Sequence, residues 1–583
     1  MGGFEIEQIP FVPDAIRSWP DPSGRLANWP VVYTINDTAD IYVGETANAL
    51  TRMRQHLANP DKRHLRAARI VLDDTFNQSV CFDLESMLIQ WFSGDGHYRV
   101  LNLNEGIRNL NYPGREGYQR VFREIFDALR GEGLFRQELR DIENSDLFKL
   151  SPFKALNIDQ VAAIENILEG LFHDLDGGVS STSVIQGQPG TGKTIVGIYL
   201  IKLLRDIQSA RGIDEVEQKG PLSDFFAEGY PERLEGFRIG LVVPQQSLRA
   251  SIARVFDRTP GLSPQMVMTP FEVGSATEPF DLLVVDEAHR LNQRANQASG
   301  PLNTAFRRIN ERLFGEDAVT RTQLDWIQER SRHRILLLDA EQSVRPADLP
   351  SEVVAELVQK AKTSDHYFRL ATQMRVRAGS DYVGYIREVL AGSAPTMPDL
   401  GEYEFAMYDD IGEMAEQIRD RDRRHGLARL VAGYAWEWRS DPKRKGMSTI
   451  PLAQRPYDIE IEGHRWRWNS TDRDWISSPG SIGEVGSIHT VQGYDLNYAG
   501  VIVGRDLRLD ESTGEIRFSR RDYFDKKGVE NNPKRGIVYT DEDILRYVRN
   551  VYGVLLTRGV RGTLVYVCDP ALREHLRRFI PAA

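Results

Sequence analysis

The stretch GQPGTGKT, Gly187 to Thr194, decides the fold of most of this 583-residue chain. It follows an apolar run, SVIQ at 183–186, and precedes a helical pattern, IVGIYLIKLL at 195–204. The pattern GxxxxGK[ST] forms a phosphate-binding loop when it lies between a strand and a helix in this order. Its glycines allow backbone N–H groups to converge on phosphate oxygens at the N-terminus of the helix. The loop therefore predicts a nucleotide site at the edge of an open α/β sheet.

The polar residues of this loop have predicted roles in binding the nucleotide. Lys193 supplies positive charge to the β- and γ-phosphates, and the Thr194 hydroxyl coordinates Mg²⁺. ATP and Mg²⁺ are therefore the predicted cofactors. The candidate nucleotide-binding residues of the loop are Gly187, Gly190, Thr191, Gly192, Lys193 and Thr194.

A second signature, LLVVDEAH at 282–289, lies downstream of the loop. Its apolar residues predict a buried strand that ends at Asp286, and open α/β sheets bind ligands at that edge. Asp286 can hold Mg²⁺ there, while Glu287 can orient and deprotonate an attacking water molecule. The pair predicts hydrolysis of the bound nucleotide.

Short β-rich runs alternate with helical segments from Ser151 onward, which predicts doubly wound parallel sheets. The runs are numerous enough for two such sheets. We place the first in a domain at 151–346 and the second in a domain at 347–583. The expected strands are 183–186, 239–243, 281–285, 335–339, 429–432, 499–503 and 563–567.

Two polar stretches interrupt this pattern and resemble insertions. Residues 208–237 are punctuated by Gly and Pro, and residues 437–480 are rich in charge and in Trp. The Trp side chains could stack on nucleic-acid bases, or they could form a small aromatic core, which we favour. The Trp residues in and beside the second stretch are Trp436, Trp438, Trp466, Trp468 and Trp475.

The residues before Ser151 have a different pattern. Runs at 31–35 and 41–44 predict two strands around a polar turn, and helical patterns follow at 48–57 and 82–92. This organisation indicates a compact α/β module within residues 1–115. Residues 116–150 are expected to form a helical linker.

Composition limits the kind of protein that this chain can be. The net charge is −11, from 73 basic and 84 acidic residues, which argues against coating duplex DNA by charge alone. A local basic groove remains compatible with that charge, and one basic stretch runs from Arg52 to Arg69. Cys81 and Cys568 form no CxxC pair, so a disulfide framework and a structural zinc site are not expected. We find no signal peptide and no apolar run of membrane-spanning length, and we expect a reducing cytoplasm.

From about Ser151 to its end, the chain resembles superfamily 1 DNA/RNA helicases, and among them the bacterial Schlafen-group-3-like family. The resemblance rests on the two signatures above and on further motifs in the family's order. These are FKALNIDQ at 153–160, VVPQQSLRASI at 242–252, LLLDAEQSVRP at 336–346, LATQMRV at 370–376, HTVQGYDLNYAGVIVG at 489–504 and YGVLLTRGVRGTLVYV at 552–567.

The resemblance implies roles for single residues of these motifs. Gln160 would read adenine, and Gln342 would sense the γ-phosphate. Segment 242–252 would touch single-stranded nucleic acid. Gly493 would lie near the interface of the two lobes, and Asp495 stands where relatives often carry a ribose-binding glutamate.

Two arginines are implied to reach the nucleotide from the second lobe. Arg375 and Arg558 would place positive charge against the γ-phosphate only when the lobes close. An arginine supplied in this way accelerates hydrolysis by about 10³–10⁵ in related NTPases. ATP binding would then favour closure, and hydrolysis would release it, which allows stepping along a strand.

The sequences VVY at 31–33 and IYVG at 41–44 resemble the paired signature of GIY-YIG nucleases, with Val31 in place of the first glycine. The resemblance implies a catalytic set of Tyr33, Tyr42, Arg52, His56, Glu85 and Asn102, with Asn104 as a possible substitute for Asn102.

Each of these residue types suits cleavage of a phosphodiester. The Glu85 carboxylate can anchor Mg²⁺, and Tyr33 or Tyr42 can help to activate the nucleophile. The Arg52 guanidinium can brace the transition-state phosphate, and His56 can position or shuttle protons.

The sequence thus predicts an ATP-dependent DNA translocase or helicase coupled to a Mg²⁺-dependent endonuclease. Its expected substrate is single-stranded or branched DNA, with no membrane involved. Defence against phage or DNA repair, with protein partners of such a system, is the expected setting. Two alternatives stay open, an ATPase switch whose N-terminal module binds without cutting, and an enzyme directed at RNA.

Overall fold

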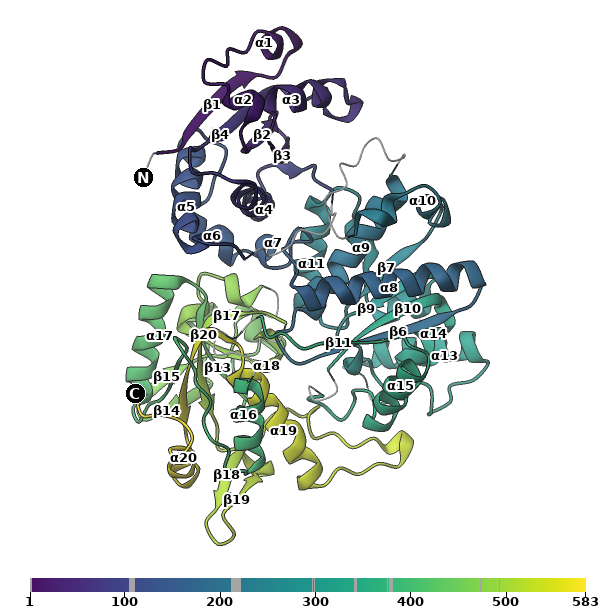
Figure 1. Ribbon diagram of the computed structural model, residues 1–583. Coiled ribbons are helices and arrows are strands. Elements are labelled where there is room, and N and C mark those ends of the chain that lie inside the picture. Colours follow the sequence, from purple (N-terminus) through teal and green to yellow (C-terminus); the bar gives the residue numbers. More distant parts are fainter. Residues whose placement is uncertain are drawn as a thin grey trace. The chain divides into compact units, whose positions relative to one another are not determined.

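The computed structural model describes residues 3–103, 111–210, 222–295, 297, 299–339, 343–374, 376, 381–471, 474–491 and 493–583 (Figure 1). The chain divides into two compact units, which we describe separately. One unit comprises Met1–Glu165, Ile198–Gly236 and Ser251–Met266. The other comprises Asn166–Gly197, Phe237–Ala250 and Val267–Ala583. Within the described ranges, no helix has the length and apolar character needed to cross a membrane.

The first unit contains a five-stranded sheet in the order β1-β4-β2-β3-β5. The pairs β1–β4, β4–β2 and β2–β3 are antiparallel, and β5 pairs with β3 in parallel. The predicted strands at 31–35 and 41–44 are confirmed as β2 and β3. The strand bounds are β1 (Glu5–Pro10), β2 (Val31–Asn36), β3 (Asp40–Thr46), β4 (Ala67–Leu72) and β5 (Arg99–Val100).

Two helices position the candidate residues of this module, and both match the predicted helical patterns. Helix α3 (Ala49–Ala58) begins after Asn48, whose side chain accepts a hydrogen bond from the Thr51 backbone N–H. Helix α4 (Gln78–Asp95) packs against β2 and β3, as Figure 1 shows. The short helices of the module are α1 (Pro13–Arg17), α2 (Arg25–Asn28) and η1 (Pro60–Lys62).

The segment expected to be a linker contributes to the core of this module. Helix α5 (Arg115–Gly131) buries Phe122, Ile125, Phe126 and Leu129. Their spacing forms one apolar stripe, which a helix must bury against another element. These side chains share a hydrophobic cluster with residues of α4 and the sheet. The helices that follow are α6 (Leu139–Asn144), α7 (Asp146–Lys149) and α8 (Ile158–Gly177).

The first parallel sheet, in the second unit, has the strand order β11-β6-β10-β9-β7-β8. All of its pairings are parallel, and the four strands predicted here are confirmed. Strand β11 belongs to this sheet, so the sheet extends beyond residue 346, where the sequence analysis ends the first domain. The bounds are β6 (Ser181–Gly187), β7 (Ile239–Val242), β8 (Val267–Met268), β9 (Phe280–Val285), β10 (Ser331–Leu338) and β11 (Tyr367–Leu370).

The helices between these strands complete the α/β alternation. They are α9 (Lys193–Ser209), α10 (Tyr230–Arg233), α11 (Gln246–Arg258), α12 (Pro270–Ser275), α13 (Gly300–Phe314), α14 (Gln323–Arg330) and α15 (Ser351–Thr363).

The second parallel sheet has the strand order β12-β20-β17-β13-β16. Along β13, Leu430 and Ala432 face one hydrophobic cluster and Val431 faces another. A strand alternates its side chains between two faces, so both faces of this sheet are covered. The strands are β12 (Glu404–Met407), β13 (Ala428–Ala432), β16 (Val485–Ser487), β17 (Leu496–Val503) and β20 (Gly559–Val567). Other elements of this region are α16 (Asp381–Ala391), α17 (Ile411–His425), α18 (Ile488–Val491), β18 (Leu507–Asp510), β19 (Glu515–Phe518), α19 (Asp541–Leu556) and α20 (Pro570–Leu576).

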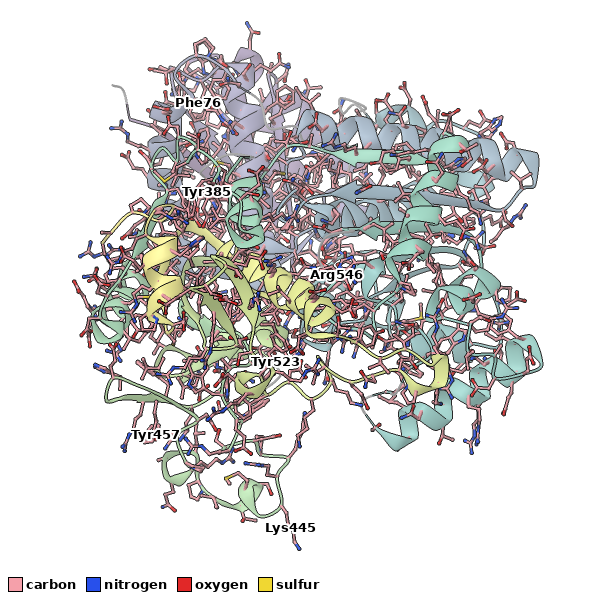
Figure 2. The ribbon with its side chains drawn as sticks, turned by 90° about the horizontal axis from the view of Figure 1, so that it is seen from below. Phe76, Tyr385, Lys445, Tyr457, Tyr523 and Arg546 are labelled. Carbon is pink, nitrogen blue, oxygen red and sulfur yellow. The ribbon has the colours of Figure 1, made fainter. Side chains whose placement is uncertain are left out.

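The Trp-rich insertion contains a small hairpin of β14 (Ile459–Ile461) and β15 (His464–Trp466). Trp466, Trp468 and Trp475 are buried, the first two in one hydrophobic cluster of the second sheet and Trp475 in the other, so they belong to the core of this sheet and do not form a separate aromatic core. The exposed side of the insertion carries Tyr457 and Lys445, which Figure 2 shows away from the strands.

Replacing Trp468 with Ala should destabilise the second parallel sheet. Its indole is 0% exposed and packs in the cluster that covers one face of the sheet. Truncation of a buried Trp to Ala typically costs about 3–5 kcal/mol. Thermal unfolding followed by calorimetry should show a lower midpoint for the transition of this region. Trp438→Ala is the comparison, because Trp438 is only partly buried and should shift the midpoint less.

Candidate functional site

The phosphate-binding loop joins β6 to α9 as predicted. Gly190 and Gly192 have φ values of 85° and 82°, a left-handed conformation that favours glycine. A Cβ atom at Gly187 would collide with the Thr191 hydroxyl. That hydroxyl donates a hydrogen bond to the Gln188 carbonyl at 2.9 Å. These three positions therefore favour glycine, Gly187 because a side chain would clash there and Gly190 and Gly192 because of their backbone conformation.

The Lys193 ammonium is held inside the loop. Its Nζ donates to the carbonyl oxygens of Gly187 at 2.7 Å and Gln188 at 3.0 Å. It also lies 3.7 Å from Asp339 Oδ2, at the end of β10. Two carbonyl oxygens of the loop thus accept the hydrogen bonds of Lys193 that phosphate oxygens would accept when a nucleotide is bound. Asp339 lies in the motif LLLDAEQSVRP at 336–346, but no role was predicted for it.

The predicted acidic pair directly follows β9. The Thr194 hydroxyl donates to Asp286 Oδ2 at 2.8 Å, so the loop and the strand end meet. Burial, and then the charge of Glu287, raises the pKa of Asp286 to about 7. Glu287 has φ 47°, and its Oε2 lies 3.1 Å from His289 Nε2. Burial alone would raise the pKa of Glu287, but its hydrogen bond and charge interaction with His289 and the charge of Lys193 lower it below the usual value.

A cavity of about 240 Å³ lies beside the loop residue Pro189. Helices α16 and α19 line it with Arg387, Arg546 and Arg549, none of which was predicted as a site residue. Arg387 Nη2 lies 3.8 Å from Asp339 Oδ1, so Asp339 stands between the loop lysine and an arginine of α16. The second sheet's helices therefore bring positive charge close to the phosphate-binding loop.

Of the remaining residues of the second sheet region that are predicted to contact the nucleotide, the structure describes Arg558, Gly493 and Asp495. Arg558 is buried, and its Nη1 donates to the Tyr494 carbonyl at 3.2 Å. Gly493 has φ 90°, and a Cβ there would lie 3.2 Å from Leu248 Cδ2 of α11. Asp495 is half-buried. The predicted residues Gln342 and Arg375 lie outside the described residues.

Gln160 lies in the first turn of α8 and is buried. Its backbone N–H donates to Asn157 Oδ1 at 2.8 Å, and its Oε1 accepts from the Asn157 N–H at 3.1 Å. This reciprocal pair caps the helix, in the manner of a capping box. Contact between Gln160 and adenine stays a prediction.

The N-terminal module brings four predicted catalytic side chains together. The Tyr33 hydroxyl lies 2.8 Å from His56 Nε2 and accepts a hydrogen bond from Arg52 Nε at 3.2 Å. The rings of Tyr42 and His56 pack edge to face, with centroids 4.9 Å apart. Gly44 stands opposite Tyr33 in the strand register, and a Cβ there would collide with the Tyr33 ring. The glycine of IYVG thus makes room for the tyrosine of VVY.

Electrostatic effects in this cluster follow from its burial. Burial raises the pKa of Tyr33 well above its ordinary value, with a further increase from Tyr42. Burial lowers the pKa of His56 to about 2, and the charges of Lys62 and Arg52 act in the same direction. His56 is therefore neutral in the folded protein, and Tyr33 is protonated.

The two remaining predicted nuclease residues have different surroundings. Glu85 is half-buried on α4, and its charge contributes to the raised pKa of Tyr33. Asn102 is buried and pairs with the backbone of Val43, donating from Nδ2 at 2.8 Å and accepting at Oδ1 at 3.1 Å. This pairing gives Asn102 a structural role at β3. Asn104 lies outside the described residues.

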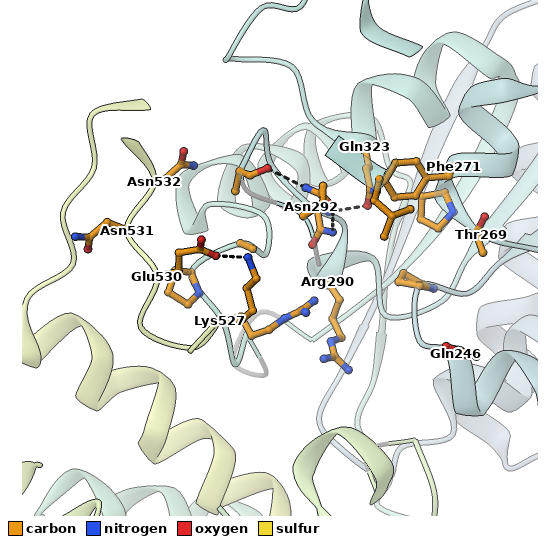
Figure 3. Close-up of a pocket in the computed structure, with 18 of the residues that line it drawn as sticks. Gln246, Thr269, Phe271, Arg290, Asn292, Gln323, Lys527, Glu530, Asn531 and Asn532 are labelled. Carbon is orange, nitrogen blue, oxygen red and sulfur yellow. Dashed lines mark hydrogen bonds and ion pairs between the residues drawn. The ribbon is translucent and has the colours of Figure 1, made fainter. Parts of the chain in front are cut away.

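A larger cavity, of about 460 Å³, lies at the carboxyl ends of β7, β8, β9 and β10. Four cations line it, and two of them, Arg290 and Lys527, are labelled in Figure 3. Lys527 pairs with Glu530 at 2.5 Å, whereas Arg249 and Arg290 bond the Val243 carbonyl and the Gln245 side chain. Burial and the charge of Arg345 lower the pKa of Arg290. The cavity carries more positive than negative charge.

The lining of this cavity also contains amides and rings suited to contact with bases. Its charged, amide and aromatic residues are Arg249, Arg290, Arg345, Lys527, Glu530, Gln246, Asn292, Gln297, Gln323, Asn531, Asn532, Phe271 and Tyr539.

Comparison with known proteins addresses the part of the chain that holds both parallel sheets. A yeast protein described as uncharacterized protein YPL245W, from Saccharomyces cerevisiae, is 28% identical over 429 residues, covering 68% of this chain and 83% of the relative. The family model "Schlafen group 3, DNA/RNA helicase domain" matches residues 180–569, which include the phosphate-binding loop, the acidic pair and the second sheet. A domain of this kind uses ATP. The chain belongs to the Schlafen group 3 DNA/RNA helicase-domain family.

Proposed function

We propose that this protein is an ATP-driven nucleic-acid motor coupled to a Mg²⁺-dependent endonuclease. The observation that carries the motor is the junction of Thr194 with Asp286 beside the loop lysine, Lys193. A hydroxyl and a carboxylate are hard oxygen ligands of the kind that Mg²⁺ prefers, and a buried carboxylate gains from a nearby cation. These residues fit a Mg²⁺–ATP complex, in which the metal neutralises phosphate charge.

Individual residues of the chain would then have separate roles in hydrolysis. Lys193 would leave the loop carbonyls and bind phosphate oxygens. Glu287 would orient the attacking water and accept its proton. Arg375 and Arg558 would add positive charge at the γ-phosphate, and we add Arg387 as a third candidate because it already approaches Asp339. Gln160, Gln342, Gly493 and Asp495 are proposed to contact the nucleotide.

The motor is proposed to contact its nucleic-acid strand at the basic cavity of about 460 Å³, at the carboxyl ends of β7, β8, β9 and β10. Three guanidinium groups can hold backbone phosphates, and Phe271 and the amides can contact bases. The cavity includes Gln246 and Arg249 of the segment that resembles the nucleic-acid-contacting motif. Single-stranded DNA is the proposed ligand. RNA of the same charge and stacking capacity is the alternative that a parallel assay distinguishes.

Removing positive charge from this cavity should weaken strand binding. In Arg249→Gln/Lys527→Gln, two phosphate contacts are lost, so the slope of log affinity against log salt should fall by about 1–2. Stimulation of ATP hydrolysis should then require more single-stranded DNA, while basal turnover stays unchanged. Lys526→Gln is the matched control, because Lys526 is an exposed neighbour outside the cavity lining. Equal salt slopes in all three proteins would remove the cavity from the proposal.

The observation that carries the nuclease is the contact of Tyr33 with both His56 and Arg52, beside Glu85 on α4. Glu85 offers one carboxylate, which can anchor Mg²⁺ that supplies charge neutralisation at the phosphate. Arg52 would bind the same phosphate group, and Tyr33 or Tyr42 would contact the nucleophile. Coupling to a motor suits DNA repair or defence against foreign DNA, a setting that rests on analogy of architecture.

One experiment tests both activities together. The pure protein is incubated with Mg²⁺ and a branched, partly single-stranded DNA, with and without ATP. We expect cleavage that requires Mg²⁺ and changes with ATP. DNA-stimulated ATP hydrolysis without cleavage of any DNA or RNA would leave a motor whose N-terminal module binds without cutting.

A further inference from the structure

The surroundings of His56 assign a separate role to each of its ring nitrogens. Lys62 Nζ lies 3.0 Å from His56 Nδ1 and 3.4 Å from the centroid of the Tyr42 ring. An ammonium group donates hydrogen bonds and accepts none, so Nδ1 must be the acceptor. The proton of the neutral imidazole must therefore sit on Nε2.

The position of that proton determines the direction of the next hydrogen bond. Nε2 lies 2.8 Å from the Tyr33 hydroxyl oxygen and donates to it. Arg52 Nε donates to the same oxygen at 3.2 Å. A phenol oxygen accepts two hydrogen bonds and donates one, so its two acceptor positions are filled. The hydroxyl hydrogen of Tyr33 can go to neither His56 nor Arg52.

His56 remains neutral in these surroundings. The titratable and charged groups that face it are Tyr33 from β2, Tyr42 from β3, Arg52 from α3 and Lys62 from η1. Two acidic groups lie nearby: Glu85 on α4 acts on Tyr33, and both Glu85 and Glu45 of β3 act on Cys81. Burial together with two cations keeps the pKa of His56 far below neutral pH.

We infer that Lys62 is a positioning residue that fixes His56 as the Nε2-protonated tautomer, so that the Tyr33 hydroxyl hydrogen points away from both His56 and Arg52 and is free to face the reacting groups. The inference rests on the proposed nuclease function of this cluster. His56 then holds Tyr33 in place and cannot shuttle its proton, because Nε2 already carries one and Nδ1 faces an ammonium. Of the two roles that the sequence allows for His56, this arrangement selects positioning.

The tautomer can be measured without any cleavage assay. The full chain is labelled with ¹⁵N-histidine, and long-range ¹H–¹⁵N spectra are recorded at neutral pH. The signals of His56 are assigned by their loss in His56→Gln. If that variant does not fold, they are assigned by contacts between the His56 and Tyr42 ring protons. We expect a protonated Nε2 and an unprotonated Nδ1.

Variants at position 62 test the role of the ammonium. Lys62→Met should release the fixed tautomer and shift the His56 signals toward a mixture of both forms, while Lys62→Arg, which still donates, should preserve it. Arg63→Met is the control, because Arg63 is exposed and its guanidinium donates a hydrogen bond to the Ala58 carbonyl, not to His56. An Nδ1-protonated or doubly protonated His56 in the natural sequence would overturn the inference. An unchanged tautomer in folded Lys62→Met would also overturn it.

Single-turnover cleavage separates this inference from the nuclease proposal. Misplacing a reacting group costs about a hundredfold in rate, so we expect such a fall for Lys62→Met with substrate binding unchanged. If the natural sequence cleaves no substrate, the nuclease proposal fails, and the NMR result still decides the tautomer. If it cleaves and Lys62→Met cleaves equally fast, the inference fails alone.

Discussion

Lys193→Ala should abolish ATP hydrolysis, with turnover falling by about a hundredfold to a thousandfold or more. The Lys193 ammonium is 3.7 Å from a single carboxylate and is otherwise bonded to two loop carbonyls, so it is poised to exchange these partners for phosphate oxygens. No other cation of the loop can replace it, because the loop from Gly187 to Thr194 contains one lysine and no arginine. Release of phosphate, measured with and without single-stranded DNA, checks this expectation.

Two control variants separate a loss of catalysis from a loss of folding. Lys445→Ala removes a lysine that is exposed in the Trp-rich insertion, and it should leave turnover unchanged (Figure 2). Lys193→Arg keeps the charge but changes the shape of the donor, and it should fold normally without giving full turnover. Undiminished hydrolysis in a folded Lys193→Ala protein would contradict the motor assignment.

The parallel sheets were largely predictable because their central strands are buried on both faces. Strands such as β9 and β10 read as continuous apolar runs, which sequence patterns detect well. Within the two parallel sheets, the strands that were not predicted are β8, β11, β12 and β16, with two to four residues each. Strand β11 illustrates the reason, because Tyr367, Phe368 and Arg369 are half-buried or exposed at the sheet edge.

The candidate sites were predictable only where residues follow a local motif. The phosphate-binding loop and the pair of Asp286 and Glu287 have local signatures, whereas Arg387 and Lys62 reach their sites through tertiary packing. Asp339 had a usable signal, since a carboxylate directly after a buried strand lies at the ligand-binding edge. The α5 stripe also had one, because four apolar residues at helical spacing are not typical of a linker.

Glu85→Gln should stop cleavage, with the rate falling by about a hundredfold or more. The substitution keeps the shape and the oxygen of the side chain but removes the charge that would hold Mg²⁺ near the phosphate. Within the described part of the cluster, the other groups that contact Tyr33 are neutral or cationic, namely His56, Arg52 and Tyr42. Cleavage of the branched DNA under single-turnover conditions measures the loss.

The same variant tests whether the two activities reside in separate modules. Glu85 lies in the first compact unit, on α4, whereas Lys193 and Asp286 belong to the second. DNA-stimulated ATP hydrolysis should therefore survive in Glu85→Gln at the level of the natural sequence. Glu124→Gln on α5 is the matched control, because Glu124 is exposed on the same module and should retain both activities. A loss of both activities in a normally folded Glu85→Gln protein would show that one site serves both reactions.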